Sequence, residues 1–324
     1  MIGLTEAQQL IEKKLAEISF PKEPRNLYHP VQYILSNGGK RIRPSLVILG
    51  ANVFTNNLDE AINPALAVEI FHNFTLLHDD LMDNSRIRRG KDTVHIKWDP
   101  NIAILSGDAM SIIANQYVSR VNSRVLPDVM EVFNRTAVEV CEGQMMDMEF
   151  EDRQDVQVDE YIRMIELKTS VLIAASLQIG ALVGGASREE SFELYEFGRY
   201  LGIAFQLQDD LLDSYGDIEK FGKKIGNDIL TNKKTFLMIS ALENATREDL
   251  RELKHWLKKE QFDPEEKIVA VKKIFDNYNI KELTLKKIHD YFYASRTELS
   301  KINVKQERKS VLLDFSDNLM KRQM

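Results

Sequence analysis

Apolar residues recur with a helical period along almost every segment of this 324-residue chain, and this feature restricts the fold most. The chain holds only 15 Gly and 8 Pro, so few positions would interrupt long helices. Ser187 followed by Glu190 has the spacing of a capping box, which indicates a helix start. No apolar/polar alternation persists long enough for a strand. We therefore expect an all-α fold, and because no Gly/Ser-rich linker divides the chain, a single domain over residues 1–324.

Charge and cysteine content exclude several classes of function. The formal net charge of −7 makes general attraction to nucleic acid improbable. The single cysteine, Cys141, excludes an internal disulfide framework and a Cys-based zinc site, and its apolar surroundings predict a buried, inert thiol. Residues 1–15 lack the apolar core of a signal peptide, and the most apolar run, 171–185, is too short to span a bilayer. We expect no transmembrane segment and a cytoplasmic location.

Two short acidic segments repeat the same chemistry. Residues 77–83 read LHDDLMD and residues 207–213 read LQDDLLD, each near the end of an apolar helical run. On a helix the first and third aspartates of each segment lie on one face, about 6 Å apart. Such a pair needs a cation, and Mg²⁺ prefers these oxygen ligands and shares them with substrate phosphates. For one copy alone, the simplest interpretation would be the solvent-exposed end of an amphipathic helix, whereas two copies favour a metal site.

Basic clusters accompany both acidic segments. GGKRIRP at 38–44 opens with glycines that let the backbone approach an anion, and its cations suit a diphosphate. A second cluster, 86–91, follows the first acidic segment, and a third, 220–234, follows the second. The simplest physical account is two anionic substrates, one bridged by metal and one bound by cations.

These residues together resemble the trans-type isoprenyl diphosphate synthases, the polyprenyl synthetase family. The matching blocks occur in the family's order over roughly residues 35–240: GKRIRP at 39–44, DDLMD at 79–83 with RRG at 88–90, GQ at 143–144, KT at 168–169, and QLQDDLLD at 206–213. The resemblance implies an isoprenoid synthase class I fold, which is a single large helical bundle around a deep central cavity. It also implies a homodimer, with the acidic segments facing each other across the mouth of the cavity.

The resemblance implies a role for each matching residue. Three Mg²⁺ ions would sit on the allylic diphosphate, with metal ligands Asp79, Asp83 and Asp209. The wider catalytic set would be Asp79, Asp80, Asp83, Lys168, Asp209 and Asp210. The allylic diphosphate would be bound by Arg88, Lys168, Thr169, Gln206, Lys223 and Lys233. Isopentenyl diphosphate would be bound by Lys40, Arg43, His72 and Arg89. Lys223 and Lys224 both lie near Gly226, and which of them contacts phosphate stays open.

The expected reaction is the head-to-tail 1′-4 condensation of isopentenyl diphosphate with an allylic diphosphate. Metal on the allylic diphosphate would stabilise the departing charge, an apolar cavity would shield the allylic cation, and released diphosphate would take the proton. In such enzymes the residues one or two turns before the first acidic segment form the cavity floor, here Phe71, Phe74 and Thr75. The small Thr75 argues against the tightest floor and the phenylalanines against very long products. We expect a geranylgeranyl product, with farnesyl as the alternative.

Two other readings compete. A class I terpene cyclase shares the fold and the first acidic segment, but its second metal segment usually mixes Asn, Ser or Thr with Glu. A regulatory subunit of a heteromeric synthase usually loses one acidic segment. Both segments are intact here, so an active magnesium-dependent prenyltransferase is the better interpretation.

Overall fold

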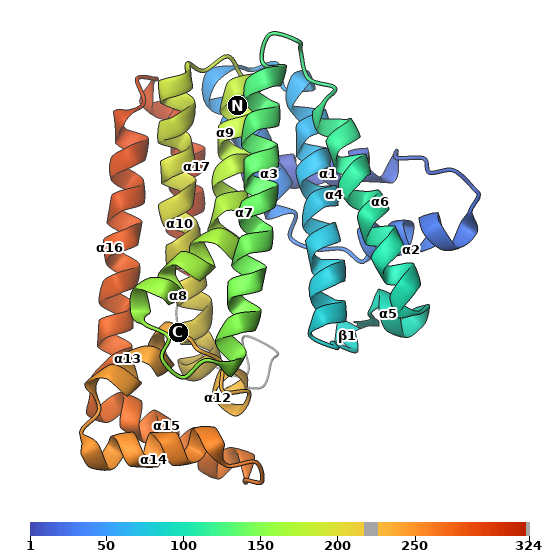
Figure 1. Cartoon of the computed structure of the whole chain (residues 1–324). Coiled ribbons are helices and arrows are strands. Elements are labelled where there is room, and N and C mark those ends of the chain that lie inside the picture. The colour runs from blue at the N-terminus through green and yellow to red at the C-terminus, as the bar shows by residue number, and fades with distance from the viewer. Residues whose placement is uncertain (217–225, 322–324) are drawn as a thin grey trace. The chain divides into compact units, whose positions relative to one another are not determined.

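The computed structural model describes residues 1–216 and 226–321, and almost all of its regular structure is helical (Figure 1). Across these residues the only strands are β1 (Ile87–Arg88) and β2 (Lys91–Asp92), which pair antiparallel. The all-α class predicted from the sequence is confirmed. The described chain divides into two compact units, and α7, α10 and α17 each contribute residues to both.

The first unit comprises 1–137, 172–195 and 301–312. Within it α4 packs against α3 and α6, and Figure 1 shows α4 and α6 side by side. Helices α3 and α4 are rich in apolar residues because they are buried along most of their length. Its helices, or the first parts of them, are α1 (Leu4–Ala16), α2 (Arg25–Ser36), α3 (Ile42–Phe54), α4 (Asp59–Met82), α5 (Val94–Lys97), α6 (Pro100–Val118), α7 (Leu126–Asp152), α9 (Val171–Val183), α10 (Arg188–Tyr215) and α17 (Gln306–Met320).

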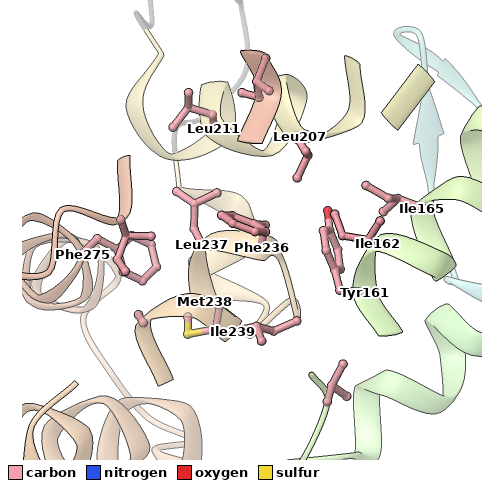
Figure 2. Close-up of a cluster of buried hydrophobic side chains, with 14 of the residues drawn as sticks. Tyr161, Ile162, Ile165, Leu207, Leu211, Phe236, Leu237, Met238, Ile239 and Phe275 are labelled. Carbon is pink, nitrogen blue, oxygen red and sulfur yellow. The ribbon is translucent and has the colours of Figure 1, made fainter. Parts of the chain in front are cut away.

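The second unit comprises 138–171, 196–300 and 313–324. Its core gathers apolar side chains from α8, α10, α13 and α15, and Figure 2 shows Tyr161, Leu207, Phe236 and Phe275 among them. Because Leu207 and Leu211 of this core lie within the acidic segment of α10, the core fixes the helix that carries the second set of aspartates. Its further elements are α8 (Val158–Ile165), the π-helical turn η1 (Glu166–Ser170), α12 (Asn227–Leu230), α13 (Phe236–Asn244), α14 (Arg247–Lys258), α15 (Pro264–Asn277) and α16 (Ile280–Lys301).

Two expectations about single features need correction. Cys141 is exposed on α7 rather than buried. It lies on the outer side of the helix, and partial burial together with Glu142 raises the pKa of its thiol, which makes the thiolate rarer. The helical stretch is also longer than the apolar run 171–185, because 158–183 is helical for 26 residues, and by length and composition alone it could cross a membrane. Its most apolar window is 83% buried inside the protein, as in a core helix.

Candidate active site

The first acidic segment ends α4. Asp79 is half-buried, Asp80 is buried, and Asp83 is exposed at the C-terminal cap of the helix. Arg88, in the hairpin that follows, donates from Nε to both oxygens of Asp80 at 2.7 and 2.8 Å and from Nη2 to Asp79 Oδ2 at 3.2 Å. Burial raises the pKa of Asp80, and the Arg88 guanidinium opposes that rise. The hairpin therefore brings a counter-charge onto the buried carboxylate.

The residue before Asp79 anchors α4 to a neighbouring helix. His78 Nε2 lies 3.3 Å from the backbone oxygen of Ile104 on α6. A Cβ on Gly107 would overlap the His78 ring, so this close approach requires glycine. The contact fixes the last turns of α4 against α6.

The residues predicted for isopentenyl diphosphate gather in the first unit. Arg43 Nη1 lies 3.2 Å from His72 Nε2, and Arg89 Nη1 donates to the backbone oxygen of Gly38. A guanidinium can only donate, so His72 Nε2 must accept as a neutral ring. Burial, and then the positive charge of Arg43, lower the pKa of His72 well below its usual value. Lys40 is exposed on the same loop, and the result is a cationic cradle suited to a diphosphate.

Arg41, between two of the predicted ligands, points the other way. It is 5% exposed and has a left-handed backbone conformation with φ of 46°. Its side chain donates to Glu69 at 2.5 Å, to Glu12 of α1 at 2.8 Å and to the backbone oxygen of Leu35 at 2.8 Å. Sequence reasoning missed this role, because nothing in a run of three cations marks which one turns inward.

The expected cavity-floor residues lie on α4. Phe71 is 2% exposed and packs against Phe74 and against Phe133 of α7, with ring centroids 5.5 Å apart in both pairs. Phe74 is half-buried and also stacks edge-on with His78 at 4.8 Å. Thr75 is half-buried and donates to the backbone oxygen of His72 at 2.8 Å. The rings form a rigid aromatic cluster one to two turns before the acidic segment.

The second acidic segment lies near the end of α10. Asp209 is exposed, Asp210 is buried and Asp213 is half-buried. Asp210 accepts from the Tyr161 hydroxyl of α8 and, at 3.0 Å, from Gln206 Nε2 one turn earlier. Burial raises the pKa of Asp210 to about 6. Tyr161 was not predicted from the sequence, since a tyrosine in an amphipathic helix usually belongs to the core.

Lys168 and Thr169 lie on the π-helical turn η1, a form that often marks functional positions. Thr169 Oγ1 donates to Gln206 Oε1 at 3.3 Å, and Lys168 Nζ donates to Asp147 Oδ2 at 2.5 Å. A Cβ on Gly143 would overlap the backbone nitrogen of Lys168, so the turn can approach α7 only at a glycine. Asp147 is a further residue that sequence reasoning missed, although it lies one turn after Gly143.

The third aspartate of this segment joins α10 to the basic loop beyond it. Asp228 donates its backbone N–H to Asp213 Oδ2 at 2.9 Å, and Lys233 donates its backbone N–H to the backbone oxygen of Asp228, also at 2.9 Å. The exposed Lys233 lowers the pKa of Asp210 against the larger effect of burial. The structure thus brings Thr169, Gln206 and Lys233 to the second acidic segment, and Lys168, next to Thr169, pairs with Asp147. Lys223 and Lys224 lie outside the described residues.

The carboxylates suit Mg²⁺ by their exposure and chemistry. In each segment the middle aspartate is buried, whereas Asp79 is half-buried, with an ion pair to Arg88, and Asp83 and Asp209 are exposed. Within residues 1–216 and 226–321 no three His, Cys, Asp or Glu side chains lie close enough together to hold a metal on their own. Mg²⁺ is commonly held by one or two carboxylates and completed by substrate phosphates, and this donor set suits that arrangement.

Comparison with known proteins identifies relatives of one family. A family model described as polyprenyl synthetase matches residues 24–275. The chain is 44% identical over 243 residues to a geranylgeranyl diphosphate synthase of Methanosarcina mazei, covering 74% of this chain and 75% of the relative. It is 37% identical over 308 residues to a short chain isoprenyl diphosphate synthase of Methanothermobacter thermautotrophicus, covering 94% and 89%.

Solved structures give the same result. The fold resembles a crystal structure of geranylgeranyl pyrophosphate synthase with a TM-score of 0.95 and 43% identity, covering 100% of both chains. It also resembles the geranylgeranyl pyrophosphate synthetase of Pyrococcus horikoshii with a TM-score of 0.89 and 33% identity, covering 98% of this chain and 97% of that one.

Proposed function

The chain belongs to the polyprenyl synthetase family, and from this premise we propose that it is a short-chain trans-prenyltransferase that makes geranylgeranyl diphosphate. It condenses isopentenyl diphosphate with allylic diphosphates, head to tail. The observation that supports the proposal is that the cations fall into two groups: Arg88 and Lys233 lie at the acidic segments, whereas Arg43 contacts His72 and Arg89 contacts the Gly38 loop. Two anionic substrates need two such groups, the first for the allylic diphosphate and the second for isopentenyl diphosphate.

The first unit supplies the isopentenyl diphosphate site. Lys40, Arg43 and Arg89 bind the diphosphate oxygens, and the neutral His72 ring holds the Arg43 guanidinium by accepting from it. A neutral histidine here leaves the positive charge on the arginines, where bidentate contacts with phosphate are strongest.

The allylic diphosphate is bound by cations and metal together. Asp79, Asp83 and Asp209 would be the Mg²⁺ ligands, and three ions would balance the negative charge of the diphosphate together with that of these carboxylates. Asp80 and Asp210 do not face the metal in this proposal; they fix the two acidic segments through Arg88 and Tyr161. The remaining allylic diphosphate ligands are Arg88, Lys168, Thr169, Gln206, Lys223 and Lys233.

The reaction needs charge neutralisation, orientation and a dry site rather than a strong base. Bound Mg²⁺ supplies neutralisation of the departing diphosphate. The cations of the chain hold both diphosphates so that the isopentenyl double bond faces C1 of the allylic substrate. The allylic C–O bond breaks, a C–C bond forms, and the released diphosphate accepts the proton lost from the isopentenyl unit.

Alanine at Asp79 or Asp209 tests the proposal directly. Turnover should fall by orders of magnitude, because each change removes a carboxylate that would hold the Mg²⁺ that neutralises the departing diphosphate, while the circular dichroism of the helices stays unchanged. Cys141→Ala, at an exposed position of α7, is the control and should retain full turnover. Unchanged turnover in both aspartate variants would exclude the assignment.

Product length depends on the aromatic cluster of α4. One helical turn is about 5.4 Å, close to one prenyl unit, so the ring one turn deeper sets the next length limit. Phe74→Ala and Phe71→Ala should lengthen the product, and Phe71, packed on Phe133, should have the larger effect on folding. Chromatographic sizing of the products decides this, and it also separates the farnesyl alternative. An unaltered profile in both variants would contradict the assignment.

The same incubation separates the competing functions. With Mg²⁺, isopentenyl diphosphate and each allylic primer, a terpene cyclase would release a hydrocarbon, and a regulatory subunit would release nothing. The proposed enzyme releases a longer diphosphate.

We also propose that residues 1–324 act as one polyprenyl synthetase domain, since the matching family model spans parts of both compact units. The chain acts in the cytoplasm without a membrane-spanning segment, because its apolar helix is largely buried.

It forms a homodimer through α6, where Ile104, Leu105 and Ile112 are 43%, 61% and 61% exposed on one face. Light scattering should give the mass of a dimer, and Leu105→Glu should shift it to that of a monomer.

A further inference from the structure

Lys267 is a buried cation that the proposed reaction does not use. It lies on α15 and is 0% exposed. Its ammonium donates to the backbone oxygen of Leu230 at 3.2 Å and to Asn232 Oδ1 at 2.7 Å, and it lies 4.2 Å from the centre of the Phe262 ring. Both oxygens are neutral, and burial lowers the pKa of the ammonium. A lysine buried against neutral groups is unfavourable for stability compared with an apolar residue, so its presence calls for another reason.

The two acceptors belong to one short loop. Leu230 ends α12, which packs on α15, and Asn232 has a left-handed backbone with φ of 58°. Asn232 also donates from Nδ2 to the backbone oxygen of Leu257 at 3.1 Å. Its side chain is therefore held from both ends, by α14 and by Lys267. An ammonium carries three donors and can fix two acceptors at once, which an apolar side chain cannot do.

The loop that Lys267 holds leads directly into Lys233. Lys233 follows Asn232, is exposed, and acts electrostatically on the buried carboxyl of Asp210. Backbone hydrogen bonds from Lys233 to Asp228 and from Thr235 to Lys233, both 2.9 Å, keep the loop short. A displacement of Asn232 would therefore move Lys233 with it.

We propose that Lys267 is a positioning residue that sets Lys233 for the allylic diphosphate by holding the 230–232 loop. The inference rests on the proposed function, because it requires that Lys233 bind that diphosphate. Lys267 does not touch substrate, so its effect has to pass through Lys233. That path predicts a selective change in one Michaelis constant.

The test is a double-mutant cycle in the full-length enzyme with Mg²⁺. Lys267→Met, Lys233→Ala and the double variant are compared by the KM for the allylic diphosphate and for isopentenyl diphosphate. Each single variant should raise the allylic KM by about tenfold, the size expected for one displaced charge-assisted hydrogen bond, while the KM for isopentenyl diphosphate stays within about twofold. The double variant should match Lys233→Ala alone. Lys273→Met, exposed on the same helix, is the matched control and should equal wild type.

Asn232→Gly tests the contact between Lys267 and Asn232 by changing the loop residue instead of the lysine. Glycine tolerates the left-handed backbone and removes the side-chain amide, and with it both the contact to Lys267 and the hydrogen bond to the Leu257 backbone oxygen. It should raise the allylic KM like Lys267→Met, and it decides the matter if that variant fails to fold.

The two proposals fail in different ways. If Lys233→Ala raises the allylic KM but Lys267→Met and Asn232→Gly do not, the positioning role is wrong and the function stands. The positioning role would also be wrong if the double variant raised the allylic KM more than Lys233→Ala alone. It would be wrong as well if Lys267→Met raised the KM values for the two substrates equally. If Lys233→Ala itself leaves the allylic KM unchanged, the assignment of Lys233 fails and the inference falls with it.

Discussion

In α4 the buried aspartate of the acidic segment faces an arginine, whereas in α10 the equivalent aspartate faces a tyrosine hydroxyl and a glutamine amide. The two segments differ little in sequence, yet Asp80 has a full counter-charge and Asp210 has only neutral donors, with its pKa raised to about 6 by burial. The same pattern of residues therefore occupies two electrostatic environments. The difference comes from the neighbouring elements: the β1–β2 hairpin directly after α4 supplies Arg88, and α8, distant in sequence from Asp210, supplies Tyr161.

The largest effect should come from removing the charged partner. Arg88→Met leaves Asp80, whose side chain is 4% exposed, buried without the guanidinium that both its oxygens accept from. Because Arg88 itself is 31% exposed, we expect a loss of unfolding free energy near the lower limit for a broken buried pair, about 3 kcal/mol. Urea unfolding in EDTA measures it. A change within error would mean that Asp80 carries no charge to compensate.

The next largest effects on stability should come from the two glycines that pack near the acidic segments, and they should differ in size. An added Cβ would overlap backbone at Gly143 but only the His78 ring at Gly107. Gly143→Ala should therefore cost about 2 kcal/mol and raise the allylic KM, since Lys168 must move, whereas Gly107→Ala should cost about 1 kcal/mol because a ring can turn away. Unfolding and steady-state kinetics of the pair check this. Equal losses would show that the ring of His78 is as firmly held as the backbone of η1.

A smaller loss should follow when the neutral partner is removed. Tyr161→Phe takes one hydroxyl from Asp210 and leaves Gln206 in place. We expect a loss of about 1 kcal/mol, the usual size for one hydrogen bond. The measurement is the same urea unfolding as for Arg88→Met. If the two variants lost equal stability, the charge of the partner would not be what distinguishes the segments.

The effect that is smallest at neutral pH, and grows as the pH falls, concerns His72. Burial, and then Arg43, hold the pKa of His72 well below 6.5, so the unfolded chain takes up this proton first as the pH falls and the native state loses stability. Asp210 has the opposite sign, because its raised pKa makes the native state bind a proton before the unfolded chain does. His72→Gln should therefore lose less stability than wild type between about pH 7 and about pH 5, by up to about 1.4 kcal/mol per pH unit. Identical pH profiles, measured in EDTA, would place a protonated His72 in the native state.

The sequence predicts the helices well because their apolar period is strong, and the capping box at Ser187 is confirmed by reciprocal hydrogen bonds with Glu190 of 3.0 and 3.1 Å. Within each unit it also predicts which polar residues gather, as Arg43 with His72 and Thr169 with Gln206 show.

It does not predict roles that depend on direction. Arg41 reads like its cationic neighbours, and only its left-handed backbone turns it towards Glu69. Cys141 reads as buried because its neighbours are apolar, but the face it occupies on α7 is outward. Lys267 lies in a charged part of the sequence, and only the fold shows that it is buried. Each depends on tertiary packing that a local pattern does not contain.

The π-helical turn Glu166–Ser170 inserts an extra residue between α8 and α9. A stretch of ordinary α-helix advances by about 100° per residue, so the insertion rotates the phase of everything downstream. Shortening this turn by one residue would preserve helical content while redirecting Lys168, Thr169 and the faces of the following helix together. The composition and length of the chain would be nearly unchanged, but Lys168 and Thr169 would lose the orientation that the proposed reaction requires.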